Sequence, residues 1–100
     1  MARHIRTDGT ESIVSPADGK EYTLEELQGY VGGTIQMVPF PDGRILVAND
    51  NGRLEGLPLN EQATTIWKEQ YPADKYPHNN TDAIVGDVLV GTREEFGYDS

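Results

Sequence analysis

The run Ala83-Ile-Val-Gly-Asp-Val-Leu-Val-Gly-Thr92 is the most apolar stretch of the chain. Its β-branched residues favour an extended strand. A strand that is apolar on both faces is typical of the middle of a sheet, so we expect residues 83–92 to complete a sheet as a central strand. Asp87 interrupts the run. It is expected at an edge or bulge, or as a buried carboxylate that marks a site.

Four further runs are rich in β-forming residues and are separated by short turn sequences. These runs are residues 3–6, 11–14, 34–40 and 44–49. Asp8-Gly9 between the first two predicts a β-hairpin, because Asp-Gly is a favoured hairpin turn. Asn51-Gly52 after the last run has the sequence of a type I′ turn, and predicts a third strand of an antiparallel meander.

Two stretches have the features of short amphipathic helices. Thr23 and Glu26 have the spacing of a capping box, which predicts a helix from Leu24 that ends at Gly32-Gly33. Asn60 is a suitable N-cap for a second helix over residues 61–70. Each helix has one apolar stripe, so we expect each to pack against the sheet.

These elements predict an α+β fold, with a mainly antiparallel sheet of four to six strands and two short helices packed on one face. One hundred residues support one core, so we expect a single domain over residues 1–92. The charged residues 93–100 are expected to form a flexible acidic C-terminal tail. The edges of so small a sheet favour a homo-oligomer.

Composition excludes several classes of protein. The chain has no cysteine, so a disulfide framework and a thiolate metal site are excluded. A formal net charge of -9 opposes direct binding to nucleic acid or to an anionic membrane, and favours basic partners. No run is long and apolar enough to span a bilayer, and the first residues lack the apolar core of a secretory signal, so we expect a cytoplasmic protein.

The sequence gives no set of residues that could assemble into a catalytic centre. The two histidines, His4 and His78, have no acidic or nucleophilic partner in sequence, and no serine lies in a nucleophile elbow. No histidine pair or calcium loop has the spacing of a metal site, and no cofactor motif is present. We therefore predict a binding protein with no cofactor, rather than an enzyme.

The Gly-Leu-Pro-x-Asn pattern of residues 56–60 and the Gly-Asp-Val-Leu-Val pattern of residues 86–90 carry a resemblance. With residues 22–33 upstream, they resemble a small domain-of-unknown-function family of bacterial, plasmid and tailed-phage proteins over residues 20–91. The resemblance implies a mobile-element protein that acts on a host system by binding. It supplies no catalytic residue.

That context leads to two predictions about function. The first is an anti-defence protein that sequesters a small nucleotide-derived signal in the host cytoplasm, with arginines for phosphate, an aromatic ring for a base and polar groups for its edges. The candidate ligand-binding residues are Arg44, Arg53, Asn60, Thr64, Trp67 and Asp87, with Tyr30 as a second stacking candidate. The alternative is an acidic protein-docking inhibitor or DNA mimic that binds a basic host protein.

Several of these candidates also have a structural role to fill. Asn60 is first expected as a helix cap, and Trp67 as a core residue on the apolar stripe of its helix. Arg44 and Arg53 are most simply solvated side chains at strand ends. The sequence leaves the structural and the ligand-binding interpretations open.

Overall fold

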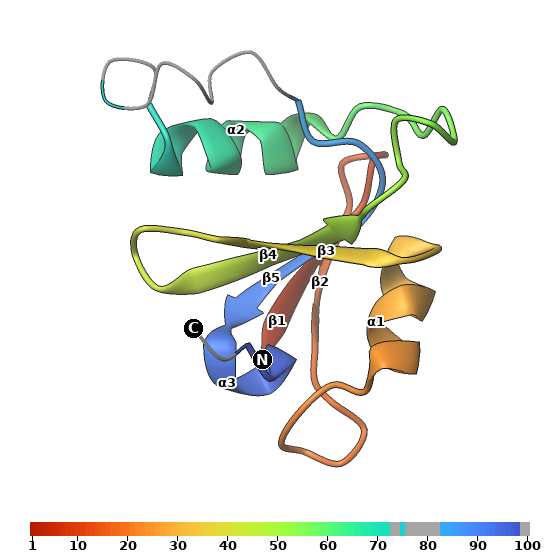
Figure 1. The fold of residues 1–100 in the computed structure, drawn as a ribbon, viewed down its shortest axis with the longest axis vertical. Helices are drawn as coiled ribbons and strands as arrows, with labels where there is room; N and C mark the ends of the chain where they lie inside the picture. The colour runs from red at the N-terminus through yellow and green to blue at the C-terminus, as the bar shows by residue number, and fades with distance from the viewer. Residues whose placement is uncertain (73–74, 76–82, 99–100) are drawn as a thin grey trace.

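A computed structural model of the chain describes residues 1–72, 75 and 83–98. Five strands form one antiparallel sheet in the order β2-β1-β5-β4-β3 (Figure 1). The α+β class and the antiparallel sheet are therefore as predicted. The elements are β1 (Ala2–Ile5), β2 (Glu11–Val14), α1 (Leu24–Val31), β3 (Ile35–Pro39), β4 (Arg44–Asn49), α2 (Glu61–Gln70), β5 (Val88–Thr92) and α3 (Arg93–Phe96).

The apolar run over residues 83–92 supplies the centre of the sheet. β5 lies between β1 and β4, and its residues Val88, Leu89 and Val90 are buried. The strand is shorter than predicted, because Val85 pairs only with Leu59 in an isolated bridge and Gly86 turns the chain with a φ of 78°. β5 thus joins the β1–β2 hairpin and the β3–β4 hairpin into one sheet.

The helices cover both faces of the sheet rather than one. Ile45 and Val47 of β4 pack towards α1 and α3, whereas Leu46 and Ala48 pack towards α2. Figure 1 shows α2 on one side of the sheet and α1 with α3 on the other. The prediction that both helices share one face was wrong, because β4 alternates apolar residues towards two separate cores.

Both helices begin where the sequence predicts. Thr23 and Glu26 form the complete capping box of α1, and Gly32 ends the helix in the left-handed conformation, with a φ of 80°. Asn60 caps α2, which spans Glu61–Gln70 as predicted. These boundaries depend on neighbours in sequence, which is why the sequence alone predicts them.

Two other segments differ from the prediction. No third meander strand follows β4; Glu55 N–H instead donates to the Asn51 carbonyl in a series of tight turns, and Asn51 does not have the positive φ that a type I′ turn needs. The expected tail at 93–100 begins with the short helix α3, whose Phe96 is buried in the core with Leu27 and Val31 of α1. Residues 99–100 lie outside the described part.

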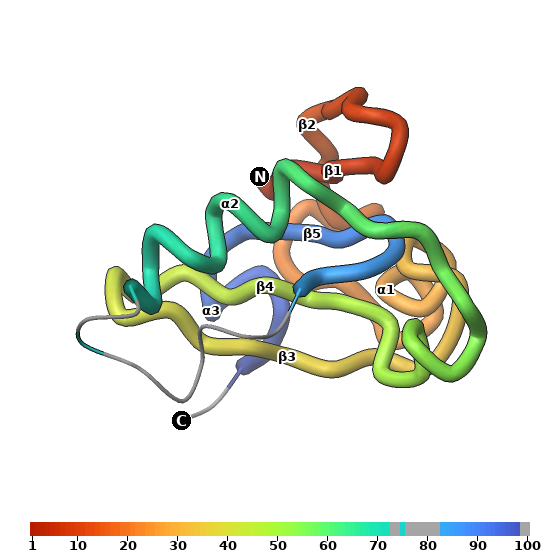
Figure 2. Tube along the Cα trace, turned by 90° about the horizontal axis from the view of Figure 1, so that it is seen from above, coloured from red at the N-terminus to blue at the C-terminus, as the bar shows by residue number. Residues whose placement is uncertain are grey.

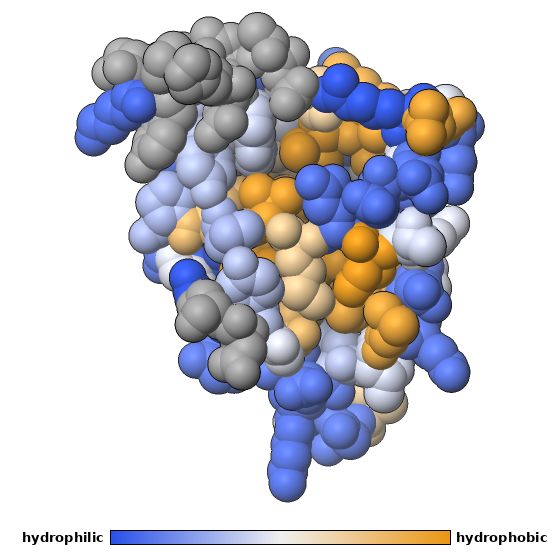
Figure 3. All heavy atoms as spheres, viewed as in Figure 1, coloured by the Kyte–Doolittle hydropathy of each residue, from blue (hydrophilic) through white to orange (hydrophobic). Residues whose placement is uncertain are grey.

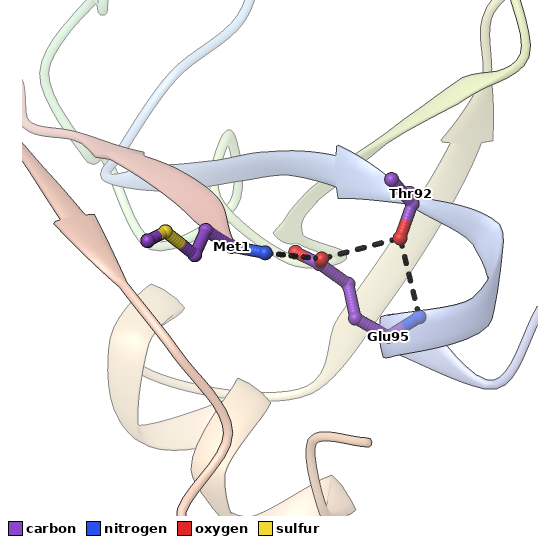
Figure 4. Close-up of polar contacts among 3 residues, drawn as sticks. All are labelled: Met1, Thr92 and Glu95. Atoms are coloured by element: carbon purple, nitrogen blue, oxygen red, sulfur yellow. Dashed lines mark hydrogen bonds and ion pairs between the residues drawn. The ribbon is translucent and has the colours of Figure 1, made fainter. Parts of the chain in front are cut away.

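A buried carboxylate attaches α3 to the start of the chain. The Met1 ammonium lies 2.8 Å from Glu95 Oε2, and the Thr92 hydroxyl donates to the same oxygen at 3.2 Å (Figure 4). Glu95 is only 6% exposed. A buried charge needs such partners, so this contact helps to hold α3 against β1 and β5.

None of the helices among residues 1–72 and 83–98 is both long and apolar enough to cross a bilayer.

Candidate functional site

The predicted residues on α2 are engaged inside the protein. Asn60 is fully buried; its side chain accepts from Ala63 N–H at 3.0 Å and donates to the carbonyls of Ile5 at 3.0 Å and Gly86 at 2.9 Å. Thr64 exchanges hydrogen bonds with the main chain of Ile84. These two side chains therefore attach α2 to β1 and to the segment that leads into β5.

Trp67 and the two arginines have different structural roles and do not form one site. Trp67 is 6% exposed and packs in the core beneath α2. Arg44 begins β4, where its Nε lies 2.8 Å from Asp42 Oδ2 and its guanidinium covers the Phe40 ring. Arg53 follows the other end of that strand and donates to the Ala83 carbonyl at 3.2 Å. The structure does not bring Arg44 and Arg53 together.

Arg53 does line a small cavity of about 140 Å³. The cavity lies beside the end of β4, and its wall combines amide side chains with apolar ones. Its other lining residues include Gln36, Asn49, Asn51, Leu54 and Ile84.

Asp87 lies in a larger cavity of about 320 Å³ between the C-terminal end of α1 and the start of β5. Its Oδ1 accepts from Thr7 N–H at 3.0 Å, and the Asp87 side chain forms no other hydrogen bond with the described residues. Tyr30, Leu57 and Pro58 form the opposite wall. Asp87 therefore offers one carboxylate oxygen to a ligand.

A shallow groove along α1 adjoins this cavity. The groove has a volume of about 320 Å³ and shares Gly29 and Tyr30 with the Asp87 cavity. Glu25 and Glu26 line its other end. We call the two hollows together the acidic groove. Its charged lining residues, among those that the structure describes, are Glu25, Glu26 and Asp87, with no lysine or arginine.

Comparison with known proteins assigns the chain to a family. A family model described as a domain of unknown function (DUF3846) matches residues 4–99. The chain belongs to the DUF3846 family. No curated protein and no solved structure matches the chain. The DUF3846 match covers every residue of the acidic groove, so the groove lies within the family domain rather than in an appended segment.

Main-chain groups hold one carboxylate of the groove in place. Glu26 Oε1 accepts from Thr23 N–H at 2.9 Å, and Oε2 accepts from Ala17 N–H at 3.0 Å. These two hydrogen bonds lower the pKa of Glu26. The side chain therefore keeps its negative charge well below neutral pH, in a fixed position at the N-terminal end of α1.

Behind Tyr30 lies a histidine that the sequence left without a partner. The ring of His4 meets that of Tyr30 edge to face, with centroids 4.9 Å apart, and His4 is 8% exposed. Burial lowers the pKa of His4 and the charge of Arg6 adds to this, while the Tyr30 carbonyl and Asp87 oppose them. The imidazole is therefore neutral at neutral pH and does not cancel the charge of the groove.

The sequence indicated Tyr30 and Asp87 only as separate candidates, and Glu25 and Glu26 were not predicted as site residues of this DUF3846 domain. One local pattern could have indicated them: Glu26 precedes Tyr30 by four residues, and Glu25 precedes Gly29 by four, so all four share one side of the helix. Glycine on that side leaves an open space next to the ring. His78 lies outside the described residues, and no three His, Asp or Glu side chains among the described residues form a metal site.

Proposed function

We propose that this protein is a non-enzymatic binding protein that docks onto a basic protein, and that the acidic groove receives an arginine or lysine side chain of that partner. The observation that carries the proposal is the acidic groove itself, whose described lining combines three acidic residues with the Tyr30 ring and contains no lysine or arginine.

The chemistry of the groove fits a guanidinium or ammonium group. A cation next to the face of Tyr30 gains a cation–π interaction, and the free oxygen of Asp87 can accept a charge-assisted hydrogen bond. Leu57 and Pro58 offer apolar surface to the aliphatic stem of the same side chain. The net charge of -9 adds long-range attraction, which accelerates encounter with a basic surface.

The same groups suit binding better than proton transfer. A general acid or base is most effective when its pKa lies near the working pH. The hydrogen bonds to Glu26 lower its pKa instead, and the neutral ring of His4 lies behind Tyr30. These features support a docking role rather than an enzyme.

The resemblance of residues 20–91 to proteins of bacteria, plasmids and tailed phages supports a setting for this role. In that setting, the protein is encoded by a phage or another mobile element and acts in the cytoplasm of the host cell. The basic partner is then a host protein, and docking onto it inhibits a host process such as defence.

A titration with a defined cation tests the proposal. The probe is a glycine-flanked peptide with one arginine, and its control is the same peptide with neutral citrulline. We expect the arginine peptide to shift the NMR signals of Gly29, Tyr30 and Asp87, and the shifts to weaken as salt is raised. Equal shifts with the citrulline peptide would contradict the proposal.

Two variants with the same change of charge distinguish binding in the acidic groove from attraction by the net charge of the protein. Asp87→Asn keeps an acceptor for Thr7 N–H and removes the charge, so we expect about tenfold weaker binding of the arginine peptide. Glu69→Gln removes a charge from the exposed side of α2, across the sheet from α1. It should change affinity by less than about twofold. Equal losses in both variants would show that net charge alone binds the peptide.

The cavity at Arg53 favours a second candidate, the sequestration of a nucleotide-derived signal. A guanidinium next to amide side chains could hold a phosphate and the polar edge of a base. The test is equilibrium binding of a panel of mononucleotides and cyclic dinucleotides. Sequestration requires that one of them binds, is recovered intact after denaturation, and is lost in Arg53→Ala but retained in Arg44→Ala.

A further inference from the structure

The edge strand β3 is bonded to β4 through alternate residues only. The strands are paired so that Gln36 lies opposite Ala48. At the two ends of this ladder, Asp50 N–H donates to the Thr34 carbonyl and Phe40 N–H donates to the Arg44 carbonyl, each at 2.8 Å. In an antiparallel ladder, bonded pairs recur at every second residue. The even-numbered residues of β3 therefore direct their main-chain groups towards β4.

The odd-numbered residues Ile35, Met37 and Pro39 direct theirs away from the sheet. Pro39 has no N–H, and its carbonyl accepts the hydroxyl of Tyr71, so that end of the edge is closed. Ile35 and Met37 each present one N–H and one carbonyl on the outward side of β3, and no strand among the described residues lies on that side. Figure 2 shows β3 as the outermost strand on this side.

This edge lacks the charged residues that usually prevent strand pairing between molecules. Residues 27–41 contain no Asp, Glu, Lys or Arg, although a quarter of the chain is charged. The other edge strand, β2, carries Glu11, which forms an ion pair with Arg3. Charges and prolines on edge strands commonly block unwanted association, and β3 has only Pro39, at one end. β3 is thus the unprotected edge of the sheet.

We infer that β3 pairs antiparallel with β3 of a second copy of this chain, about a two-fold axis at Gln36. This register places Ile35 opposite Met37 of the other copy, so four main-chain hydrogen bonds form. A two-fold at Ile35 would pair Met37 with Gly33, whose N–H already donates to the Gln28 carbonyl. A two-fold at Met37 would pair Ile35 with Pro39, which is closed. The Gln36 register alone uses all the free groups.

Symmetry and charge favour a second copy as the occupant. The two-fold at Gln36 lets the outward groups of the two copies satisfy one another, and the neutral edge lets two chains of net charge -9 meet where no like charges face each other. A basic partner would instead be drawn to carboxylates, which this edge lacks. Apolar side chains also gather over the middle of this side of the molecule (Figure 3). Ile35 and Met37 are half-buried against the α1 core, and pairing would cover them further.

Cross-linking tests the register directly, because the natural chain has no cysteine. Gln36 of the two copies would form a non-hydrogen-bonded pair with Cα atoms about 4.5 Å apart, which a disulfide can span. We expect Gln36→Cys to form a disulfide-linked dimer on mild oxidation. Ile13→Cys is the control on the other edge strand, since Ile13 lies on β2 and is 60% exposed. Equal cross-linking of both variants would overturn the inference.

A charge at the same position tests the dimer without oxidation. Gln36→Lys lowers the net negative charge of each copy, yet places two ammonium groups face to face, so we expect the dimer dissociation constant to rise at least about tenfold. Ile13→Lys changes the net charge equally and should change it by less than about twofold. Sedimentation equilibrium measures both. A wild-type chain that stays monomeric up to millimolar concentration, or a dimer equally weakened by both substitutions, would refute β3 pairing.

Discussion

Replacement of Asn60 tests whether one buried side chain joins α2 to the sheet. Asn60→Ala removes the cap of Ala63 N–H and both donors to the carbonyls of Ile5 and Gly86. Loss of an N-cap costs about 1 kcal/mol, and each of the other two hydrogen bonds contributes about 1 kcal/mol, more where a buried group is left unpaired. We expect a loss of about 3–4 kcal/mol, a large part of the stability of a domain of this size.

Urea denaturation measures this loss, with fluorescence of the single tryptophan, Trp67 on α2, as the reporter. With an m value of about 1 kcal/mol/M, the midpoint should fall by about 3–4 M. Thr23→Ala is the matched control: it removes the exposed N-cap of α1 and should cost only about 1 kcal/mol.

Asn60→Asp sharpens the test. At an ordinary N-cap, Asp and Asn are equally good. Here the carboxylate keeps the cap of Ala63, but it turns an oxygen instead of two N–H donors towards the carbonyls of Ile5 and Gly86, in a fully buried site. Asp should therefore be at least as harmful as Ala. A stable Asn60→Asp protein, or an Asn60→Ala loss no larger than that of Thr23→Ala, would refute the reasoning.

Three further substitutions test buried polar groups and close packing on the α1 side of the sheet. The Tyr22 hydroxyl is buried without a hydrogen-bond partner among the described residues, and burial, with the charge of Glu95, raises its pKa to about 12. Tyr22→Phe should stabilise the protein by about 1 kcal/mol at pH 7, as measured by urea denaturation. Between about pH 10 and 12 the tyrosine ionises only in the unfolded chain, so the wild type should lose stability over this range, and Tyr22→Phe should remove that loss. The lowered pKa of His4 means that the unfolded chain binds a proton first, so wild-type stability should fall as pH drops below about 6.5. In His4→Phe, denaturation midpoints over the same range should fall less steeply, and an unchanged slope would contradict the assignment. Gly91→Ala would place a Cβ against the Glu95 carboxylate and 3.1 Å from Ala2 Cβ. We therefore expect a lower thermal unfolding midpoint than in the wild type. An unchanged midpoint would show that Glu95 and Ala2 can move aside without loss of stability.

Local rules account for the parts of the fold that the sequence predicted. The capping box of Thr23 and Glu26, the cap at Asn60 and the Asp8-Gly9 hairpin each involve residues within a few positions of one another. The same rule could have found α3, because Thr92 and Glu95 repeat the Thr-x-x-Glu spacing and Thr92 caps that helix. The charged composition after Thr92 obscured this pattern.

The layer arrangement was less accessible, although its cause is visible in β4. Ile45 and Val47 alternate with Leu46 and Ala48, so the strand is apolar on both faces and needs cover on both. Alternation shows that two cores exist, but not which helix covers which face. That choice depends on the insertion of β5 between β1 and β4, a pairing between distant parts of the chain.

The acidic groove shows the same limit at the level of function. The sequence could identify Glu26 and Tyr30 as neighbours on one helix, because their spacing fixes it. Asp87 joins them only because β5 enters the centre of the sheet and carries the preceding residues past the C-terminal end of α1. Asn60, in contrast, was also a ligand-binding candidate in the sequence, but in the structure its two side-chain donors bind the carbonyls of Ile5 and Gly86. Residue type shows what a side chain can bind, and long-range strand pairing decides whether that capacity is used inside the fold or offered to a partner.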